Sequence, residues 1–201
     1  MRVGIDLDNT LICYDRAFAR VGKEEGLLSA SFEGNKSAVK RTLLAERPDG
    51  FLWERLQGLV YGRRIDAAEL FEGVAAFVEA CRQRGDTVAI VSHKTERAHH
   101  DPLLTDLRAA ALQWMERNRF FEEDGLGIDR RNIFFEGTRD EKVRRIRSLA
   151  CDVFVDDLVE VLEHADMPPA CRRILFGSDP HGAFEQYSSW HEVRGALFPA
   201  P

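Results

Sequence analysis

An apolar run that ends abruptly in carboxylates stands near the start of the sequence, Val3-Gly4-Ile5-Asp6-Leu7-Asp8-Asn9-Thr10. A short run of this kind is typical of a buried strand, and open α/β sheets place their chemistry at the C-terminal ends of such strands. In a regular strand Asp6 and Asp8 would point to the same face. Two carboxylates so close repel each other unless a cation or a shared proton lies between them. The alternative is a strand end at which Asp8 or Asn9 caps the next helix.

The composition sets limits on the class of protein. The 201 residues allow one core domain with a modest insertion, and the net charge of -6 does not favour a nucleic acid polymer as partner. The sequence has no apolar run that could span a bilayer and no basic start followed by a long apolar core, so we expect a cytoplasmic protein without membrane association. The four cysteines form no C-x-x-C pair, which argues against zinc and for reduced, mostly buried thiols.

Strands and helices alternate regularly from Asp66 onward. Strands are expected at 87–91, 132–135, 152–155 and 173–176. Helices are expected after a capping box at 66–69, from Asp101-Pro102, after Thr138, over 158–165 and after Ser189. This alternation predicts an α/β fold in which a parallel sheet is covered on both faces, a three-layer α/β/α arrangement.

The segment 26–68 interrupts this alternation. It contains the turn signals 34–36 and 47–50, the helical pattern 38–44 and an amphipathic pattern over 51–60, but no good strand. We therefore predict a small all-helical insertion at 26–68 in an α/β core that comprises 1–25 and 69–201.

Reactive side chains follow three of the predicted strands. They are Asp6 and Asp8, Ser92, and Asp156 with Asp157, and Lys142 lies at the start of a helix close to the same sheet edge. Carboxylates gathered in one crevice need a hard cation, and oxygen ligands suit Mg²⁺. The hydroxyl, ammonium and backbone N–H groups suit an anion with several oxygens, which indicates phosphate.

With these residues the sequence resembles the haloacid dehalogenase superfamily in its phosphatase branch, from about residue 3 to 176. The first motif of that family, Asp-x-Asp-x-Thr, is matched by Asp6, Asp8 and Thr10. The second, a Ser or Thr that ends the next strand, is matched by Ser92. The third is a Lys at a helix start, for which Lys142 is the choice, and the fourth is the acidic pair 156–157. The resemblance implies a HAD-like Rossmannoid fold, and it identifies the insertion 26–68 with the family's cap.

The resemblance also implies a role for each site residue. Asp6 would attack phosphorus and form an aspartyl-phosphate, and Asp8 would act as general acid and then as general base. Mg²⁺ would be held by Asp6, by the backbone carbonyl of Asp8 and by Asp156, with Asp157 in or next to the ligand set. The residues expected to contact the substrate or to shape its loop are Thr10, Ser92, His93, Lys94 and Lys142.

The predicted function is Mg²⁺-dependent hydrolysis of a small phosphomonoester, a sugar phosphate or a nucleotide. A receiver-like phosphoacceptor domain and a metal-dependent glycosyltransferase of the Asp-x-Asp type are the alternatives. Some of these residues could instead have a purely structural role. Ser92 could cap a turn, the acidic pair 156–157 could cap a helix, and Lys142 could be a solvated lysine. In the last case Arg139 could bind phosphate instead.

Overall fold

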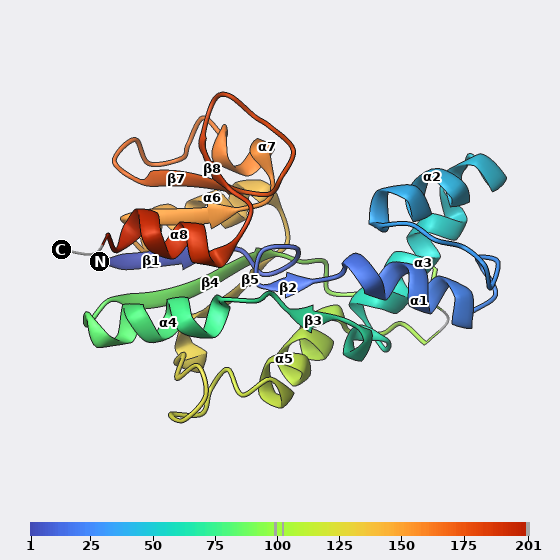
Figure 1. The fold of residues 1–201 in the computed structure, drawn as a ribbon, viewed down its shortest axis with the longest axis horizontal. Helices are drawn as coiled ribbons and strands as arrows, with labels where there is room; N and C mark the ends of the chain where they lie inside the picture. The colour runs from blue at the N-terminus through green and yellow to red at the C-terminus, as the bar shows by residue number, and fades with distance from the viewer. Residues whose placement is uncertain (99, 102, 200–201) are drawn as a thin grey trace. The chain divides into compact units, whose positions relative to one another are not determined.

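Six parallel strands form the main sheet of the computed structural model, which describes residues 1–98, 100, 101 and 103–199 (Figure 1). The strand order is β5-β4-β1-β6-β7-β8. The strands are β1 (Arg2–Ile5), β4 (Thr87–His93), β5 (Ile133–Glu136), β6 (Val153–Asp156), β7 (Arg172–Phe176) and β8 (Glu185–Tyr187). The predicted α/β fold with a parallel sheet is therefore confirmed.

The described chain divides into two compact units. One unit comprises 1–12, 70–94 and 118–201 and contains the sheet, and the other comprises 13–69 and 95–117 and is helical. The first unit contains α4 (Val74–Gln83), η2 (Arg130–Asn132), α6 (Arg139–Ser148), α7 (Val159–Leu162) and α8 (Trp190–Leu197). The second contains α1 (Asp15–Glu24), α2 (Lys36–Glu46), α3 (Phe51–Tyr61), η1 (Ile65–Ala67) and α5 (Leu107–Arg117). The short strands β2 (Ile12–Cys13) and β3 (Glu69–Leu70) pair where the chain passes between the units.

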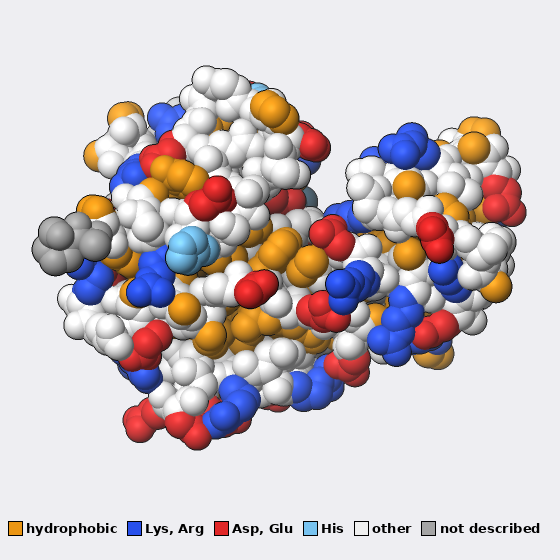
Figure 2. Space-filling model, in the orientation of Figure 1, with side chains coloured by type: hydrophobic (Ala, Val, Ile, Leu, Met, Phe, Trp, Pro, Cys, Tyr) orange, Lys and Arg blue, Asp and Glu red, His pale blue; other side chains and the backbone are white. Residues whose placement is uncertain are grey.

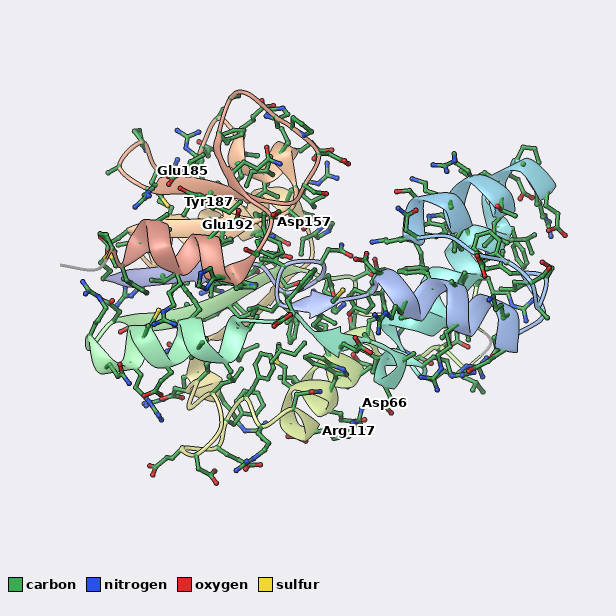
Figure 3. All side chains as sticks on the ribbon, in the orientation of Figure 1. Asp66, Arg117, Asp157, Glu185, Tyr187 and Glu192 are labelled. Atoms are coloured by element: carbon green, nitrogen blue, oxygen red, sulfur yellow. The ribbon has the colours of Figure 1, made fainter. Side chains whose placement is uncertain are left out.

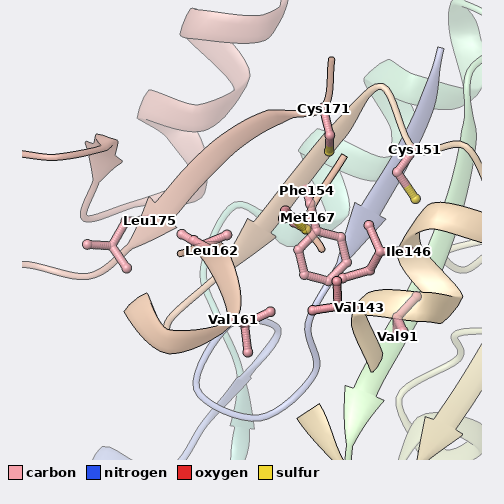
Figure 4. Close-up of a cluster of buried hydrophobic side chains, with 10 residues drawn as sticks. All are labelled: Val91, Val143, Ile146, Cys151, Phe154, Val161, Leu162, Met167, Cys171 and Leu175. Atoms are coloured by element: carbon pink, nitrogen blue, oxygen red, sulfur yellow. The ribbon is translucent and has the colours of Figure 1, made fainter. Parts of the chain in front are cut away.

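Helices cover both faces of the sheet, so the sheet unit has the three predicted layers. Helices α4 and α8 pack together on one face, where the ring of Trp190 lies 4.7 Å from that of Phe77 and 5.4 Å from that of Phe176. Helices α6 and α7 cover the other face (Figure 4). The buried cluster there comprises Val91, Val143, Ile146, Cys151, Phe154, Val161, Leu162, Met167, Cys171 and Leu175.

Strand β1 carries a glycine where a neighbouring ring approaches its backbone. A Cβ atom on Gly4 would lie 2.5 Å from Cδ2 of Phe154 and 2.9 Å from Sγ of Cys151. We expect Gly4→Ala to lower the free energy of unfolding by about 1–3 kcal/mol, because extra methyl groups in a packed core force neighbours to shift. Urea denaturation measures the loss. Gly195→Ala is the control, because a Cβ at Gly195 meets nothing within 4 Å, and equal stability of Gly4→Ala and the wild type would contradict the packing.

The helical unit has its own aromatic core. The rings of Phe18 and Trp53 stack with centroids 5.1 Å apart, and the ring of Tyr61 meets Phe18 edge-on at 5.6 Å. On the same unit the indole N–H of Trp114 in α5 donates to the carbonyl of Ala68. Arg117 at the end of α5 pairs with Asp66 at 2.6 Å (Figure 3).

These contacts explain why the helical unit is larger than the predicted insertion 26–68. The sequence pattern places helix α1 in the core segment 1–25, but Phe18 packs on aromatic side chains of α3. Helix α5 joins the same unit through Trp114, although 95–117 lies within the predicted core segment 69–201. Amphipathic spacing shows that a helix has an apolar face, but it does not show which neighbour covers that face.

Two local expectations were wrong, and one strand was not predicted. The segment 66–69 is not a capping box, because the 3₁₀ turn and β3 occupy it and α4 starts only after Gly73, whose φ is +88°. The helix predicted from Asp101-Pro102 starts only at Leu107. Pro102 lies outside the described residues. The carboxylate of Asp101 accepts hydrogen bonds from the backbone N–H groups of residues 103 and 105. Strand β8 was not predicted, because its three half-buried residues carry no apolar run.

The surface and the cysteines agree with the composition. Acidic and basic side chains are interspersed over the face in Figure 2. No helix in the described part of the chain is long and apolar enough to cross a membrane. All four cysteines are free, and burial raises the pKa of Cys81 and Cys151 to about 12, which keeps both thiols neutral.

Candidate active site

Three neighbouring strands bring their polar ends to one edge of the sheet. Strand β1 lies between β4 and β6, with Ile5 level with Ile90 on one side and with Val155 on the other. The backbone N–H of Asp6 donates to the carbonyl of Val155 at 2.9 Å, which extends the pairing by one residue. Asp6 therefore follows β1 next to the last residue of β6, Asp156, as parallel pairing requires.

A tight loop follows Asp6 and ends the strand earlier than the sequence suggested. The N–H groups of Leu11 and Ile12 both donate to the carbonyl of Leu7, and the N–H of Asn9 donates back to the carbonyl of Ile12. Asn9 adopts φ +60°, a left-handed conformation that asparagine tolerates better than most residues. Because the next helix starts only at Asp15, neither Asp8 nor Asn9 caps it.

Lys142 is the central cation of the sheet edge. Its Nζ lies 2.6 Å from Oδ1 of Asp6 and 2.6 Å from Oδ2 of Asp156, and the lysine is completely buried. A capping box of Thr138 and Glu141 fixes the start of α6, which places this lysine close to the helix N-terminus. Both burial and the helix dipole oppose a cation there, so the acidic partners must hold it. The alternative residue, Arg139, is exposed.

The pKa values of this cluster follow from burial and from close charges. Burial raises the pKa of Asp6 well above its usual value of 3.8, although the ammonium group of Lys142 opposes the shift. The neighbouring carboxylates of Asp156, Asp157 and Asp8 raise it further. Burial alone would lower the pKa of Lys142, but the carboxylates of Asp156 and Asp6 outweigh it and the pKa is raised. The lysine therefore keeps its charge, and a further cation would favour the ionised form of Asp6.

Three carboxylates of this cluster could hold a metal ion. One oxygen each from Asp6, Asp156 and Asp157 lies within 4.8 Å of the others. The Nδ2 of Asn9 donates to Oδ2 of Asp157 at 3.2 Å, and the N–H of Leu158 donates to Oδ1 of Asp156 at 2.9 Å. These hydrogen bonds fix the orientation of both carboxylates. Each carboxylate oxygen has two lone pairs, so these bonds leave capacity for a cation. The donor set is all oxygen and fits a hard cation.

Asp8 forms an ion pair with Lys94. The Nζ of Lys94 lies 2.7 Å from Oδ2 of Asp8, and the side chain of Lys94 is 3% exposed. The neighbouring His93 contacts the carbonyl of Gly137 through Nε2 at 3.1 Å. Among the two carboxylates of the Asp-x-Asp motif, Asp6 is thus paired with Lys142 and Asp8 with Lys94.

Two buried hydroxyl groups at this edge have no hydrogen-bond partner among the described residues. They are Oγ1 of Thr10 and Oγ of Ser92. Ser92 lies inside β4, so it does not cap a turn. A buried hydroxyl without a partner is costly, and it can be satisfied by a ligand or a water molecule.

Two residues that shape the site were not predicted to do so. The indole N–H of Trp190 donates to the carbonyl of Thr10 at 2.8 Å, which ties the loop after β1 to α8, and Asn9 holds Asp157. Nothing in the spacing around Trp190 indicated this contact across 180 residues. Asn9 could have been found, because it lies within the motif that supplies the carboxylates.

The fold is that of solved haloacid dehalogenase superfamily hydrolases. A structure from Clostridium acetobutylicum described as a predicted phosphatase is 14% identical, with a TM-score of 0.62 and coverage of 99% of this chain and 98% of the other. A haloacid dehalogenase-like hydrolase from Streptococcus pneumoniae is 12% identical, with a TM-score of 0.62 and coverage of 98% and 97%. A family hydrolase from Deinococcus radiodurans, solved with bound phosphate and sodium, is 19% identical, with a TM-score of 0.55 and coverage of 98% and 94%.

No family model matches the sequence, and no curated protein sequence is significantly similar. The structural similarity covers nearly the whole chain, so the resemblance seen in the motifs is confirmed at the level of the fold. The chain has a haloacid dehalogenase-like fold, a Rossmann-like α/β/α sheet unit with a second, helical unit.

Proposed function

We propose that the protein is a Mg²⁺-dependent phosphatase that hydrolyses a small phosphomonoester through an aspartyl-phosphate on Asp6. The observation that carries this proposal is the pair of separately held carboxylates, Asp6 against Lys142 and Asp8 against Lys94. Hydrolysis in two steps needs a nucleophile and a separate acid–base group, and this pair supplies both. A pure phosphoacceptor would have no task for Asp8.

In the first step a carboxylate oxygen of Asp6 attacks phosphorus and the bond from phosphorus to the ester oxygen breaks. The leaving oxygen takes a proton from Asp8 and departs as an alcohol. The hydroxyl of Ser92 and the ammonium of Lys142 would donate to phosphoryl oxygens, where charge is greatest. The unsatisfied hydroxyl of Ser92 supports this role.

In the second step a water molecule attacks phosphorus of the aspartyl-phosphate. Asp8, now ionised, takes a proton from this water, and the bond from phosphorus to Asp6 breaks. The products are inorganic phosphate and the free carboxylate of Asp6. The loop conformation that Asn9 adopts and the hydrogen bond from Trp190 to the carbonyl of Thr10 would keep Asp8 close to the sheet edge through both steps.

The residues that would hold the metal ion are Asp6, Asp156 and Asp157, with the backbone carbonyl of Asp8. Mg²⁺ would neutralise charge on the transferring phosphoryl group. The sheet edge carries four carboxylates and two ammonium groups, Asp6, Asp8, Asp156, Asp157, Lys94 and Lys142. A divalent cation would balance this excess of negative charge.

The proposed substrate class is a small phosphorylated metabolite. The Clostridium acetobutylicum structure is described as a predicted phosphatase, and the Deinococcus radiodurans structure contains phosphate, which supports phosphate chemistry on this fold. The test is a screen of sugar phosphates and nucleotides with Mg²⁺, in which phosphate release is measured. Release from at least one phosphomonoester is expected, and no release from any member of a broad panel would contradict the proposal.

Removal of metal should abolish the activity. We expect EDTA to stop phosphate release and Mg²⁺ to restore it. Mg²⁺ should also raise the melting temperature of the wild type, because a cation that binds the native state relieves repulsion among Asp6, Asp156 and Asp157. Asp156→Asn should lose most of this thermal shift, whereas Asp166→Asn, which changes an exposed aspartate, should keep it. Full activity after exhaustive chelation would refute the metal site.

A further inference from the structure

The ion pair between Lys94 and Asp8 lies at the same sheet edge as the metal cluster of Asp6, Asp156 and Asp157, and the side chain of Asp8 is not one of the three carboxylates of that cluster. Lys94 Nζ is 2.7 Å from Oδ2 of Asp8, and the side chains are 3% and 19% exposed. The backbone of Lys94 is also fixed, because its N–H donates to the carbonyl of Glu136 at 3.0 Å, one residue beyond β4. A long lysine side chain loses much rotamer freedom when it is held in this way, so the contact is a defined feature of the site.

We propose that Lys94 is the positioning residue for the acid–base carboxyl of Asp8. This inference rests on the proposed function and deepens it, because it assigns to Lys94 a task other than direct contact with the substrate. The ammonium group would hold Oδ2 through both steps and so direct the other oxygen, Oδ1, toward the leaving oxygen and later toward the attacking water. Lys94 itself neither gains nor loses a proton in either step.

The geometry favours positioning over phosphate binding. Lys142 and Lys94 differ in their partners: Lys142 bridges Asp6 and Asp156 of the metal cluster, whereas Lys94 is paired with Asp8. A charge-assisted hydrogen bond of this length restricts the orientation of a carboxylate more strongly than a neutral one. Asp8 lies within the tight loop after β1, outside the regular strand, so the strand pairing alone does not fix its side chain.

A positioning role predicts a specific kinetic pattern for Lys94→Met. On an alkyl phosphate, the single-turnover rate constant of the first step should fall by roughly 10–100-fold, below the ~10²–10⁴-fold that acid–base help is typically worth. On an aryl phosphate, whose leaving group needs little acid help, the fall in this rate constant should be several-fold smaller. KM should change little with either substrate. Lys94→Gln, which keeps a hydrogen-bond donor, should recover part of the loss and guards against a folding defect in the Met variant.

The double variant Asp8→Ala with Lys94→Met separates positioning from other roles. If Lys94 acts through Asp8, the double variant should be no slower on the alkyl phosphate than Asp8→Ala alone. A second readout does not depend on turnover: Mg²⁺ should shift the melting temperature of Lys94→Met as much as that of the wild type. Lys23→Met, in the last turn of α1, is the matched control and should behave as wild type in every assay.

Two results would overturn the inference. One is an equal loss on alkyl and aryl phosphates with a raised KM, which would make Lys94 a substrate-binding residue. The other is a double variant whose loss is the product of the two single losses. If Asp8→Ala itself shows no leaving-group dependence, the proposed function and this inference both fail. If Asp8→Ala shows it and Lys94→Met does not, only the inference fails.

Discussion

Asp6→Asn is expected to abolish phosphate release while the protein stays folded. An amide cannot displace the leaving oxygen from phosphorus, yet it is nearly isosteric with the carboxylate. Removal of a catalytic residue costs on the order of 10⁴–10⁶-fold in other enzymes, and we expect a loss in this range. Phosphate release under Mg²⁺ saturation, with the best substrate from the screen, measures it.

The fold of Asp6→Asn should be intact because Lys142 keeps its second partner, Asp156, at 2.6 Å. Loss of one carboxylate from a cluster of like charges should leave the melting temperature without Mg²⁺ equal to that of the wild type or higher. Asp166→Asn is the matched control with full activity. The intact mass must be checked, because deamidation of the introduced amide would restore the carboxylate. Near wild-type turnover by a verified variant would exclude Asp6 as nucleophile.

Asp8→Ala is expected to slow the first step, in which the phosphoryl-enzyme forms, much more on poor leaving groups than on good ones. On an alkyl phosphate the loss should approach the ~10²–10⁴-fold typical of general acid–base catalysis. The leaving group of an aryl or acyl phosphate departs without a proton, so the first step on these substrates should be nearly unaffected. Single-turnover kinetics on both substrate types measures the difference. This pattern separates an enzyme from a phosphoacceptor, in which Asp8 would matter equally little for both.

The control for Asp8→Ala is Asp166→Ala, which removes an exposed carboxylate and should leave both rates unchanged. Circular dichroism must confirm that Asp8→Ala is folded, because the buried Lys94 loses the carboxylate with which it is paired. Equal losses on good and poor leaving groups would mean that Asp8 is structural.

Much of the sheet unit could be predicted from the sequence, because its strands are nearly continuous apolar runs that end in polar residues. The runs before Asp6, Ser92 and Asp156 are read directly as buried parallel strands. Since parallel strands end at a common edge, the neighbourhood of these three residues follows from the pattern alone. A helix was likewise expected after Thr138, and it carries Lys142.

The other features of the structure depend on contacts between segments that are distant in the sequence, and the spacing of residues along the chain does not encode such contacts. The assignment of α1 and α5 to the helical unit comes from the packing of Phe18 and Trp114. The sequence could not show whether Lys142 or Arg139 lies at the sheet edge, because both belong to one run of basic residues. The structure distinguishes them, because Lys142 is buried and Arg139 is exposed. The partner of Asp8 also could not be read from the chain, because Lys94 is 86 residues away.

The most direct test of the account is to trap the phosphoryl group on Asp6. With Asp8→Ala and an aryl or acyl phosphate, the first step should proceed and the second should stall, since the base for water is missing. Rapid acid quench, proteolysis and mass spectrometry should then find one added phosphoryl group on the peptide that contains Asp6, and none in the Asp6→Asn, Asp8→Ala double variant. A phosphoryl group on another residue, or turnover of the activated substrate by Asp8→Ala without any trapped phosphoryl-enzyme, would contradict the proposed mechanism.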